Sequence, residues 1–436
     1  MKRLLLLLII FTIIGVNTSY SSENITLSSL NLNNQTTTNC TDHLIEYYHL
    51  QIQKSPSDYY NYDKLGQLHI RKARETGDLS LYDKAEQFLK KSLELNSNNY
   101  NSYIFLGQVA SSRHDFNKTL KYAKKAMEID NKEASAYGIM GDAYIELGQY
   151  KQAQRAYEKM VSLKSSLYSL SRLSHIKDIT GDTDGAILEM KKSIRYGFRH
   201  RLPKENMAWA EVILGSLYFN KGDLKNAEVH YLKSLSHLNN YYLALEHLAE
   251  INAVKGDYEK AIKIYQVVLE INPSPDFHAA ISGVYDKMGN KEKAEEHLKI
   301  AKDKYENYLD SGYLGYLEHH AAFYADNEIK LDNALELAHK DLEMKQDVFT
   351  YDTLAWVYYQ LGNFKQALKY SKKSLEHGTK DAGIYFHAGM INYSAGNLSD
   401  AKKYFDLCLK TNPYFDMSSA DEVRNLIRQI EQSNAV

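Results

Sequence analysis

Apolar and polar positions along most of the chain follow a helical pattern that recurs about every 34 residues. Each unit contains a stretch that opens on a small residue and continues with apolar side chains three or four positions apart, as in KAEQFLKKSLEL, QAQRAYEKMVSL and KAIKIYQVVLEI. Such spacing predicts amphipathic α-helices. The opening residues are Ala85, Thr119, Ala153, Ala186, Ala227, Ala261, Ala294, Ala334, Ala367 and Ala401. The intervals between them are 34, 34, 33, 41, 34, 33, 40, 33 and 34 residues, which indicates a repeat array.

Each period predicts two helices joined by a short turn. Glycine precedes a polar residue in many of the turns, and it can take the left-handed conformation that closes a helix. These turn glycines are Gly148, Gly222, Gly256, Gly362 and Gly396. In the first helix of a pair, a large apolar residue stands beside a glycine small enough for close helix approach, as at Met140-Gly141 and Leu214-Gly215. In the second helix, an aromatic residue lies four positions after the opening small residue, as at Tyr157.

These residues resemble the tetratricopeptide repeat, a helix-turn-helix unit of 34 residues. The resemblance covers about Ser57 to Pro413 in ten copies. It implies an all-α fold, a right-handed α-solenoid of about ten stacked repeats whose first helices line an inner groove. The physical reason for stacking is that one hairpin cannot bury its apolar face alone. Segments such as GDTDGAILEM and DTLAWVYYQLG also resemble a group of exported bacterial repeat proteins of unassigned role.

Composition agrees with a helical, soluble repeat array. Apolar residues make up 44% and charged residues 25% of the 436, while only 5 prolines are present to interrupt helices. Lys plus Arg number 53 against 55 Asp plus Glu, so no whole-molecule field attracts nucleic acid or anionic membrane. We therefore expect a protein or peptide partner recognised by shape, and no nucleic acid. The sequence sets no oligomeric state.

The two ends predict segments outside the array. Lys2 and Arg3 precede an apolar run from Leu4 to Val16, and Ser19-Tyr20-Ser21 follows with the small-x-small pattern of a cleavage site. Residues 1–21 therefore predict a signal peptide and an exported protein, periplasmic or secreted, with no direct membrane insertion after cleavage. An uncleaved segment would instead anchor the chain in a membrane.

The mature chain divides into four further segments. Residues 22–41 are rich in Asn, Ser and Thr and predict a flexible leader. Residues 42–56 predict an N-terminal helix, residues 57–417 the solenoid, and residues 418–436 a capping helix with a tail. The last helix has the pattern of a capping box at its start and an amphipathic face suited to cover the final repeat. The two longer intervals, and extra residues in the first repeat, mark points where we expect the superhelical pitch to change.

The motifs of common enzymes and metal sites do not occur. The sequence holds no phosphate-binding loop, dinucleotide-binding turn, nucleophile elbow, zinc-binding HExxH helix or CxxC pair. No two of the 16 histidines are three or four residues apart, as a metal site on one helix would require. We therefore expect no enzyme, no cofactor and no metal. Cys408 stands at a small, interior position and is expected to be a buried thiol.

The sequence favours an exported scaffold that binds a partner in its concave groove, with assembly of an envelope or secreted complex as one such role. An enzyme acting in the groove is the alternative. Aromatic residues off the stacking face predict the partner site in the last two repeats. The predicted groove residues are Asp352, Trp356, Tyr359, Phe386, Met390 and Tyr393. The competing interpretation is that the helix beginning near Ser419, or the superhelix itself, buries them.

Overall fold

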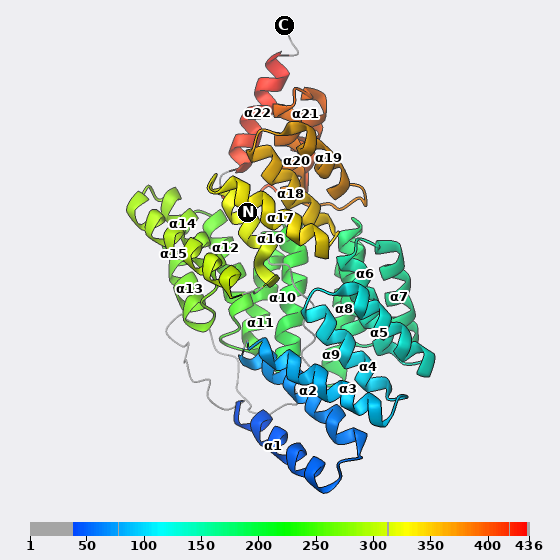
Figure 1. The fold of residues 1–436 in the computed structure, drawn as a ribbon. Helices are drawn as coiled ribbons and strands as arrows, with labels where there is room; N and C mark the ends of the chain where they lie inside the picture. Colours follow the sequence, from blue (N-terminus) through cyan, green and yellow to red (C-terminus); the bar gives the residue numbers. More distant parts are fainter. Residues whose placement is uncertain (1–37, 77, 312–313, 418, 434–436) are drawn as a thin grey trace. The chain divides into compact units, whose positions relative to one another are not determined.

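Helical hairpins make up almost all of the structure, a computed structural model that describes residues 38–76, 78–311, 314–417 and 419–433 (Figure 1). Those residues form 22 α-helices and one short 3-10 helix, with no β-strand among them. The chain divides into two compact units, whose described parts are residues 38–165 and residues 166–433. The first unit contains α1 (Thr38–Lys54), α2 (Tyr59–Thr76), α3 (Ser80–Leu95), α4 (Tyr100–Ser112), α5 (Phe116–Ile129), α6 (Ala134–Glu146) and α7 (Tyr150–Leu163).

The second unit contains the remaining helices and the 3-10 segment. They are α8 (Leu167–Ile179), α9 (Thr183–Arg199), α10 (Lys204–Asn220), α11 (Leu224–His237), α12 (Tyr242–Val254), α13 (Tyr258–Ile271), α14 (Pro275–Lys287), α15 (Lys291–Asp310), η2 (Leu314–Tyr316), α16 (Leu317–Asp326), α17 (Leu331–Met344), α18 (Val348–Gln360), α19 (Phe364–Ser374), α20 (Ala382–Ser394), α21 (Leu398–Thr411) and α22 (Ser419–Ser433). Paired in order from α2 to α21, the helices form ten hairpins, so the predicted all-α solenoid of about ten repeats is confirmed.

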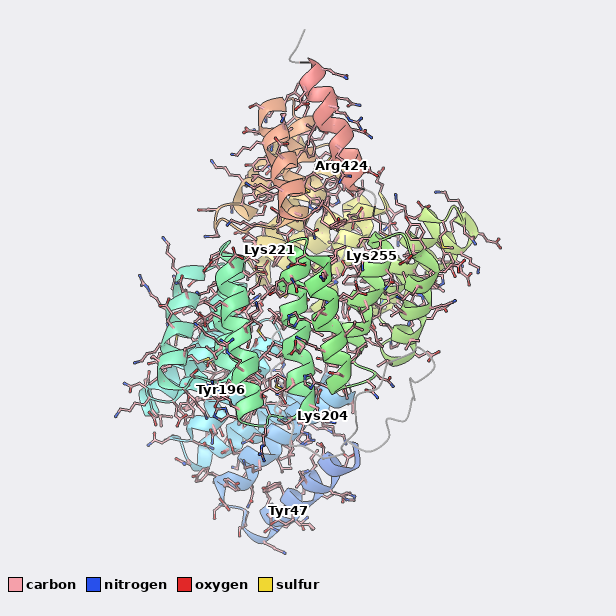
Figure 2. All side chains as sticks on the ribbon, turned by 180° about the vertical axis from the view of Figure 1, so that it is seen from behind. Tyr47, Tyr196, Lys204, Lys221, Lys255 and Arg424 are labelled. Atoms are coloured by element: carbon pink, nitrogen blue, oxygen red, sulfur yellow. The ribbon has the colours of Figure 1, made fainter. Side chains whose placement is uncertain are left out.

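The longer repeats lengthen helices. The first repeat places its extra residues in α2, which has 18 residues where α4 and α6 have 13. The longer intervals extend α9 and α10 to 17 residues each and α15 to 20. Lys204 and Lys221 mark the two ends of the extended α10 (Figure 2). Because an added turn continues the backbone hydrogen bonds of a helix, this is a low-cost way to accommodate extra residues.

The turn glycines have the conformation that the sequence predicts. All five have positive φ, between 66° at Gly148 and 85° at Gly256. Two hairpins without glycine at this point use His114 and Glu328, with φ of 57° and 53°. A non-glycine residue takes this conformation at a cost, so the glycine pattern in the sequence is a direct signal of where first helices end.

Three glycines inside first helices, Gly141, Gly215 and Gly389, pack against aromatic rings of the second helices. A Cβ atom on Gly141 would lie 2.2 Å from the Tyr157 ring, and one on Gly215 would lie 2.5 Å from the Tyr231 ring. Both tyrosines are fully buried. Gly389 repeats this arrangement. The pairing explains both the glycine beside a large apolar residue in the first helix and the aromatic residue at the matching point of the second.

Within residues 166–433, the loops of the last repeats return to the turns of the first ones. Thr379 donates its hydroxyl to the Ile179 carbonyl at 2.5 Å, and Asn412 donates its amide to the Phe219 carbonyl at 2.8 Å. Both acceptors lie in the last turns of helices, α8 and α10, where carbonyl groups lack partners within the helix. These bonds between residues about 200 positions apart place the loops after α19 and α21 beside the C-terminal ends of α8 and α10.

The terminal helices differ in detail from the sequence predictions. Helix α1 begins at Thr38, four residues before the predicted start, and ends at Lys54. Pro56 accounts for the end, since a proline disfavours helical backbone in the residue before it. Helix α22 begins at Ser419, and the Asp416 carboxylate accepts a hydrogen bond from the Ser419 backbone NH at 2.9 Å. Ser418, the signal peptide and most of the leader lie outside the described residues.

Candidate functional site

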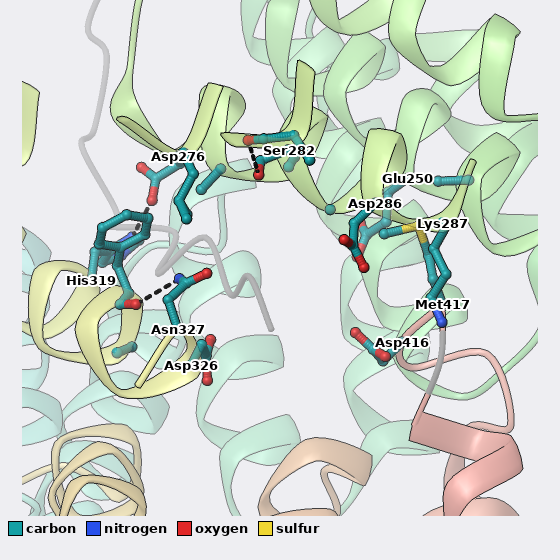
Figure 3. Close-up of a pocket in the computed structure, with 18 of the residues that line it drawn as sticks. Glu250, Asp276, Ser282, Asp286, Lys287, His319, Asp326, Asn327, Asp416 and Met417 are labelled. Atoms are coloured by element: carbon teal, nitrogen blue, oxygen red, sulfur yellow. Dashed lines mark hydrogen bonds and ion pairs between the residues drawn. The ribbon is translucent and has the colours of Figure 1, made fainter. Parts of the chain in front are cut away.

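A cavity of about 570 Å³ lies within residues 166–433. Its lining comes chiefly from the first helices of successive repeats, α12, α14, α16 and α18, with residues of α15, α20 and the loop between α21 and α22 (Figure 3). The cavity therefore forms on the helix face that the repeat pattern predicts to be the inner groove. Met417 in the α21–α22 loop packs against α14, where a Cβ atom on Gly283 would lie 3.5 Å from its methyl carbon.

One part of the lining is apolar and made of small side chains. Ala279, Ala280 and Gly283 on α14, Ala253 on α12 and Ala322 on α16 all contribute. Small residues at these positions leave the space that larger side chains would occupy. They provide no hydrogen-bonding side chain, so polar contacts with an occupant depend on the residues at the two ends of the cavity.

A wall of stacked rings closes the side next to α18 and α20. The Trp356 ring lies between Tyr359 and His387, with ring centroids 4.7 Å and 4.1 Å away and planes within 13° of parallel. Its indole NH donates to Asp326 Oδ1 at 2.9 Å. His387 Nδ1 lies 2.9 Å from Asp352 Oδ2. Both faces of the indole are thus covered, and this wall is held by polar contacts at each end.

The end of the cavity near α16 carries an acid-base pair of a half-buried histidine and a buried aspartate. His319 Nδ1 lies 3.1 Å from Asp276 Oδ1, and the Tyr305 hydroxyl donates to the same carboxylate. Burial acts to lower the pKa of His319, but the negative charges of Asp276 and Glu318 outweigh it and raise that pKa above its ordinary value. Burial and the Asp276 charge together raise the pKa of Tyr305, so its hydroxyl stays protonated and keeps donating.

Behind this end, one buried lysine interacts with several carboxylates. Lys345 Nζ lies 2.6 Å from Glu318 Oε2 and 3.4 Å from Asp341 Oδ2. Burial, which the Lys345 charge only partly offsets, raises the pKa of Asp341 to about 7, with further contributions from Glu318 and Asp347. The pKa of Asp347 is raised for the same reasons. Lys345 is only 6% exposed, so its charge is already engaged by these carboxylates and does not line the cavity.

The other end of the cavity, near the turn between α14 and α15, has a more mixed charge. Figure 3 shows Asp286, Lys287 and Glu250 there, opposite Asp416 of the α21–α22 loop. Lys291 forms an ion pair with Asp286. In total the lining holds eight carboxylates and two lysines, so it is acidic although the whole chain is nearly balanced in charge.

The six predicted groove residues separate into two groups. Asp352 and Trp356 line the cavity, both less than 8% exposed. The other four are not part of the lining and contact other parts of the fold. Tyr359 stacks on Trp356, Phe386 packs on Phe415 with ring centroids 5.6 Å apart, Met390 is half-buried, and the Tyr393 hydroxyl donates to Gln429 of α22. Their role in partner binding remains a prediction.

Sequence reasoning missed the acidic end of the cavity. Asp276, His319 and Asp326 come from two different repeats, and only the stacking of α14 beside α16 and α18 brings them to one place. Asp276 follows Pro275 in a sequence that reads as an ordinary helix start. The one available signal was that these residues sit on first helices, which face the groove.

No group of three or more His, Cys, Asp or Glu side chains suited to hold a metal ion occurs in the described parts of the chain. Two histidines do meet across a hairpin, since His278 Nδ1 and His297 Nδ1 lie 3.1 Å apart. Cys408 is fully buried as expected, and burial, together with the Asp416 charge, raises its pKa to about 12. It is therefore protonated and unreactive at neutral pH.

The chain matches family models along both units. The model of anaphase-promoting complex, cyclosome, subunit 3 matches residues 78–160. Tetratricopeptide repeat models match residues 212–236, 243–275, 350–376 and 382–415. The chain thus contains segments that match the tetratricopeptide repeat. None of these matched models describes an enzyme.

Similar proteins share the repeats over different lengths. A TPR repeat-containing protein of Methanocaldococcus jannaschii is 22% identical over 391 residues, which cover 88% of this chain and 55% of that protein. The mitochondrial import receptor subunit TOM70 of Rattus norvegicus is 30% identical over 110 residues, 24% of this chain and 18% of TOM70. The chain thus spans about half of the first relative and less than a fifth of the second. The crystal structure of a tetratricopeptide repeat protein from Parabacteroides merdae covers 61% of this chain and 98% of its own, with 19% identity and a TM-score of 0.36.

In the part of the chain that the structure describes, no helix combines the length and the apolar character that a membrane span needs. The apolar run at residues 4–16 lies outside that part.

Proposed function

We propose that this chain is a non-catalytic scaffold that binds a polypeptide partner on the inner face of its repeats, and that the cavity between α12 and α18 anchors the partner. The observation that carries the proposal is the cavity itself, about 570 Å³ on the face formed by first helices. Stacking alone does not require an opening of this size, because packed helix interfaces leave few voids larger than a water molecule. The segments that match tetratricopeptide repeats support a protein-binding role.

Selection from a random peptide library tests this proposal. Peptides should be enriched on the purified chain and lose binding to the variant Ala322→Phe, because the new ring enters the cavity from the half-buried Ala322 position. The melting temperature of the variant serves as the folding control. If the selected peptides bind Ala322→Phe as tightly as the parent chain, the cavity is not the anchoring site.

We further propose that the scaffold is exported and acts in an envelope or secreted complex. The motive is the basic start at Lys2 and Arg3, the apolar run that follows and the Ser19-Tyr20-Ser21 pattern. N-terminal sequencing of the protein from its native host should give a mature end near Ser22. Recovery of intact Met1 in the cytosolic fraction would end the export hypothesis and leave the binding proposal standing.

A further inference from the structure

We infer that the polypeptide held in this cavity presents a positively charged side chain, an arginine or a lysine, to the carboxylates near Asp326. This inference rests on the proposed binding function and specifies the chemistry of the partner. It depends on the charge of the lining, the shape of the cavity and the arrangement of its two ends.

The lining has a local excess of negative charge. Its eight carboxylates face two lysines and two histidines. Even with both imidazoles protonated, and with Lys345 counted behind Glu318, the carboxylates exceed the cations eight to five. Over the whole chain, by contrast, acids and bases nearly cancel. A concave site with low-dielectric walls concentrates such a field, so it attracts cations and repels anionic segments.

The two ends of the cavity are not equivalent. At the α14–α15 turn, Lys287 and Lys291 already stand among the carboxylates. At the α16–α18 end, the cations that line the cavity are the imidazoles of His319 and His387. Among the described residues, no lysine or arginine lines this second end. A cationic head group should therefore bind most favourably there.

The shape of the cavity suits a long side chain with a charged tip. Its apolar part combines small residues, such as Ala279, Ala322 and Gly283, with larger apolar side chains, such as Leu298 and Phe323. Lysine and arginine side chains have an aliphatic stem that packs on such a surface while the head group stays in polar surroundings. The Trp356 ring is covered on both faces by Tyr359 and His387, so it forms a wall and is not open to stacking by the occupant.

Peptide binding with an isosteric neutral control tests the inference. The probe is a fluorescein-labelled peptide of alternating arginine and alanine. Its control carries citrulline in place of arginine, which keeps the shape and removes the charge, and a third peptide carries glutamate. Fluorescence anisotropy should show binding of the arginine peptide, at least tenfold weaker binding of the citrulline peptide, and no binding of the glutamate peptide. The affinity for the arginine peptide should also fall as NaCl is raised.

Variants of the chain locate the charge contact. Asp326→Asn keeps an oxygen that accepts from the Trp356 indole NH and removes the negative charge. This variant should lower the affinity for the arginine peptide by about tenfold, the size expected for the loss of a contact to a charged group. Asp332→Asn is the matched control, since Asp332 is an exposed carboxylate on α17 outside the cavity lining. It should leave affinity unchanged.

The outcomes separate this inference from the function on which it rests. Equal binding of the arginine and citrulline peptides, or equal losses from Asp326→Asn and Asp332→Asn, overturns the charged anchor. Peptides that are selected from the random library and blocked by Ala322→Phe would still support the scaffold. If the library yields no peptide that depends on the cavity, the proposed function fails as well. If the Asp326→Asn variant does not fold, the citrulline peptide and the salt series, both measured on the parent chain, test the charged anchor.

Discussion

Replacement of Gly141 by a larger residue tests the glycine–aromatic contact that recurs in three hairpins of this solenoid. Gly141 lies in the first helix α6, and a Cβ atom there would be 2.2 Å from Cε1 and 2.6 Å from Cδ1 of Tyr157. Ordinary contacts begin near 3.4 Å, so the ring or the helix must move by more than 1 Å. Tyr157 has little freedom to move, because it is fully buried and donates its hydroxyl to Asp142 at 2.8 Å.

The expected cost follows from two opposing terms. An alanine gains about 1 kcal/mol over glycine in a helix interior, while overpacking of a core costs typically 1–3 kcal/mol. Gly141→Ala should therefore be neutral to about 2 kcal/mol destabilising. Gly141→Leu adds three more carbon atoms at the same point and should cost about 3 kcal/mol or more.

Urea unfolding monitored by circular dichroism measures these changes in the free energy of unfolding. Gly283→Ala is the matched control, a glycine inside the first helix α14 whose Cβ would meet only the Met417 methyl carbon at 3.5 Å. It should raise stability by up to about 1 kcal/mol. A second variant, Gly141→Ala with Tyr157→Leu, should show a favourable coupling energy, since the smaller side chain removes the ring that the methyl group meets. The packing argument is refuted if Gly141→Leu unfolds at the same urea concentration as the parent chain.

Two further predictions concern a wall of the cavity and an ion-pair network of the first unit. Trp356→Ala should cost about 3–5 kcal/mol of stability, because the ring is only 7% exposed and stacked on both sides. A lower melting temperature would show that Trp356 is a packing residue. An unchanged melting temperature with lost peptide affinity would show instead that it anchors the partner. Burial acts to raise the pKa of Glu86, yet its bonds to Lys90 and Arg113 and the Lys118 charge lower that pKa to about 2. Since the folded-state pKa lies below the unfolded one, this stabilisation is present above pH 4.5 and is lost as the pH falls toward 2. Glu86→Gln should lower the free energy of unfolding by about 1 kcal/mol at pH 7 and make stability less dependent on pH in the acid range. An unchanged dependence of stability on pH would contradict the role given to Glu86.

The sequence determined the fold because its signals are local and repeated. Helix period, turn glycines and the small residue that opens each second helix act within one hairpin, and each recurs often enough to establish the array. Gly141 and Tyr157 lie 16 positions apart, yet the 34-residue spacing places them on facing helices without any knowledge of the rest of the chain. The buried position of Cys408 was predictable for the same reason.

The cavity, by contrast, was decided by the tertiary structure. The spacing placed Asp352 and Trp356 off the stacking face, but it contained no information that Asp326, from the preceding repeat, would accept the Trp356 hydrogen bond. The loop after α21 reaches the cavity because Asn412 bonds to a carbonyl 193 residues away. Periodicity describes how each hairpin meets its neighbour. Contacts between distant repeats depend on small rotations accumulated over many hairpins, and no local pattern in the sequence records that sum.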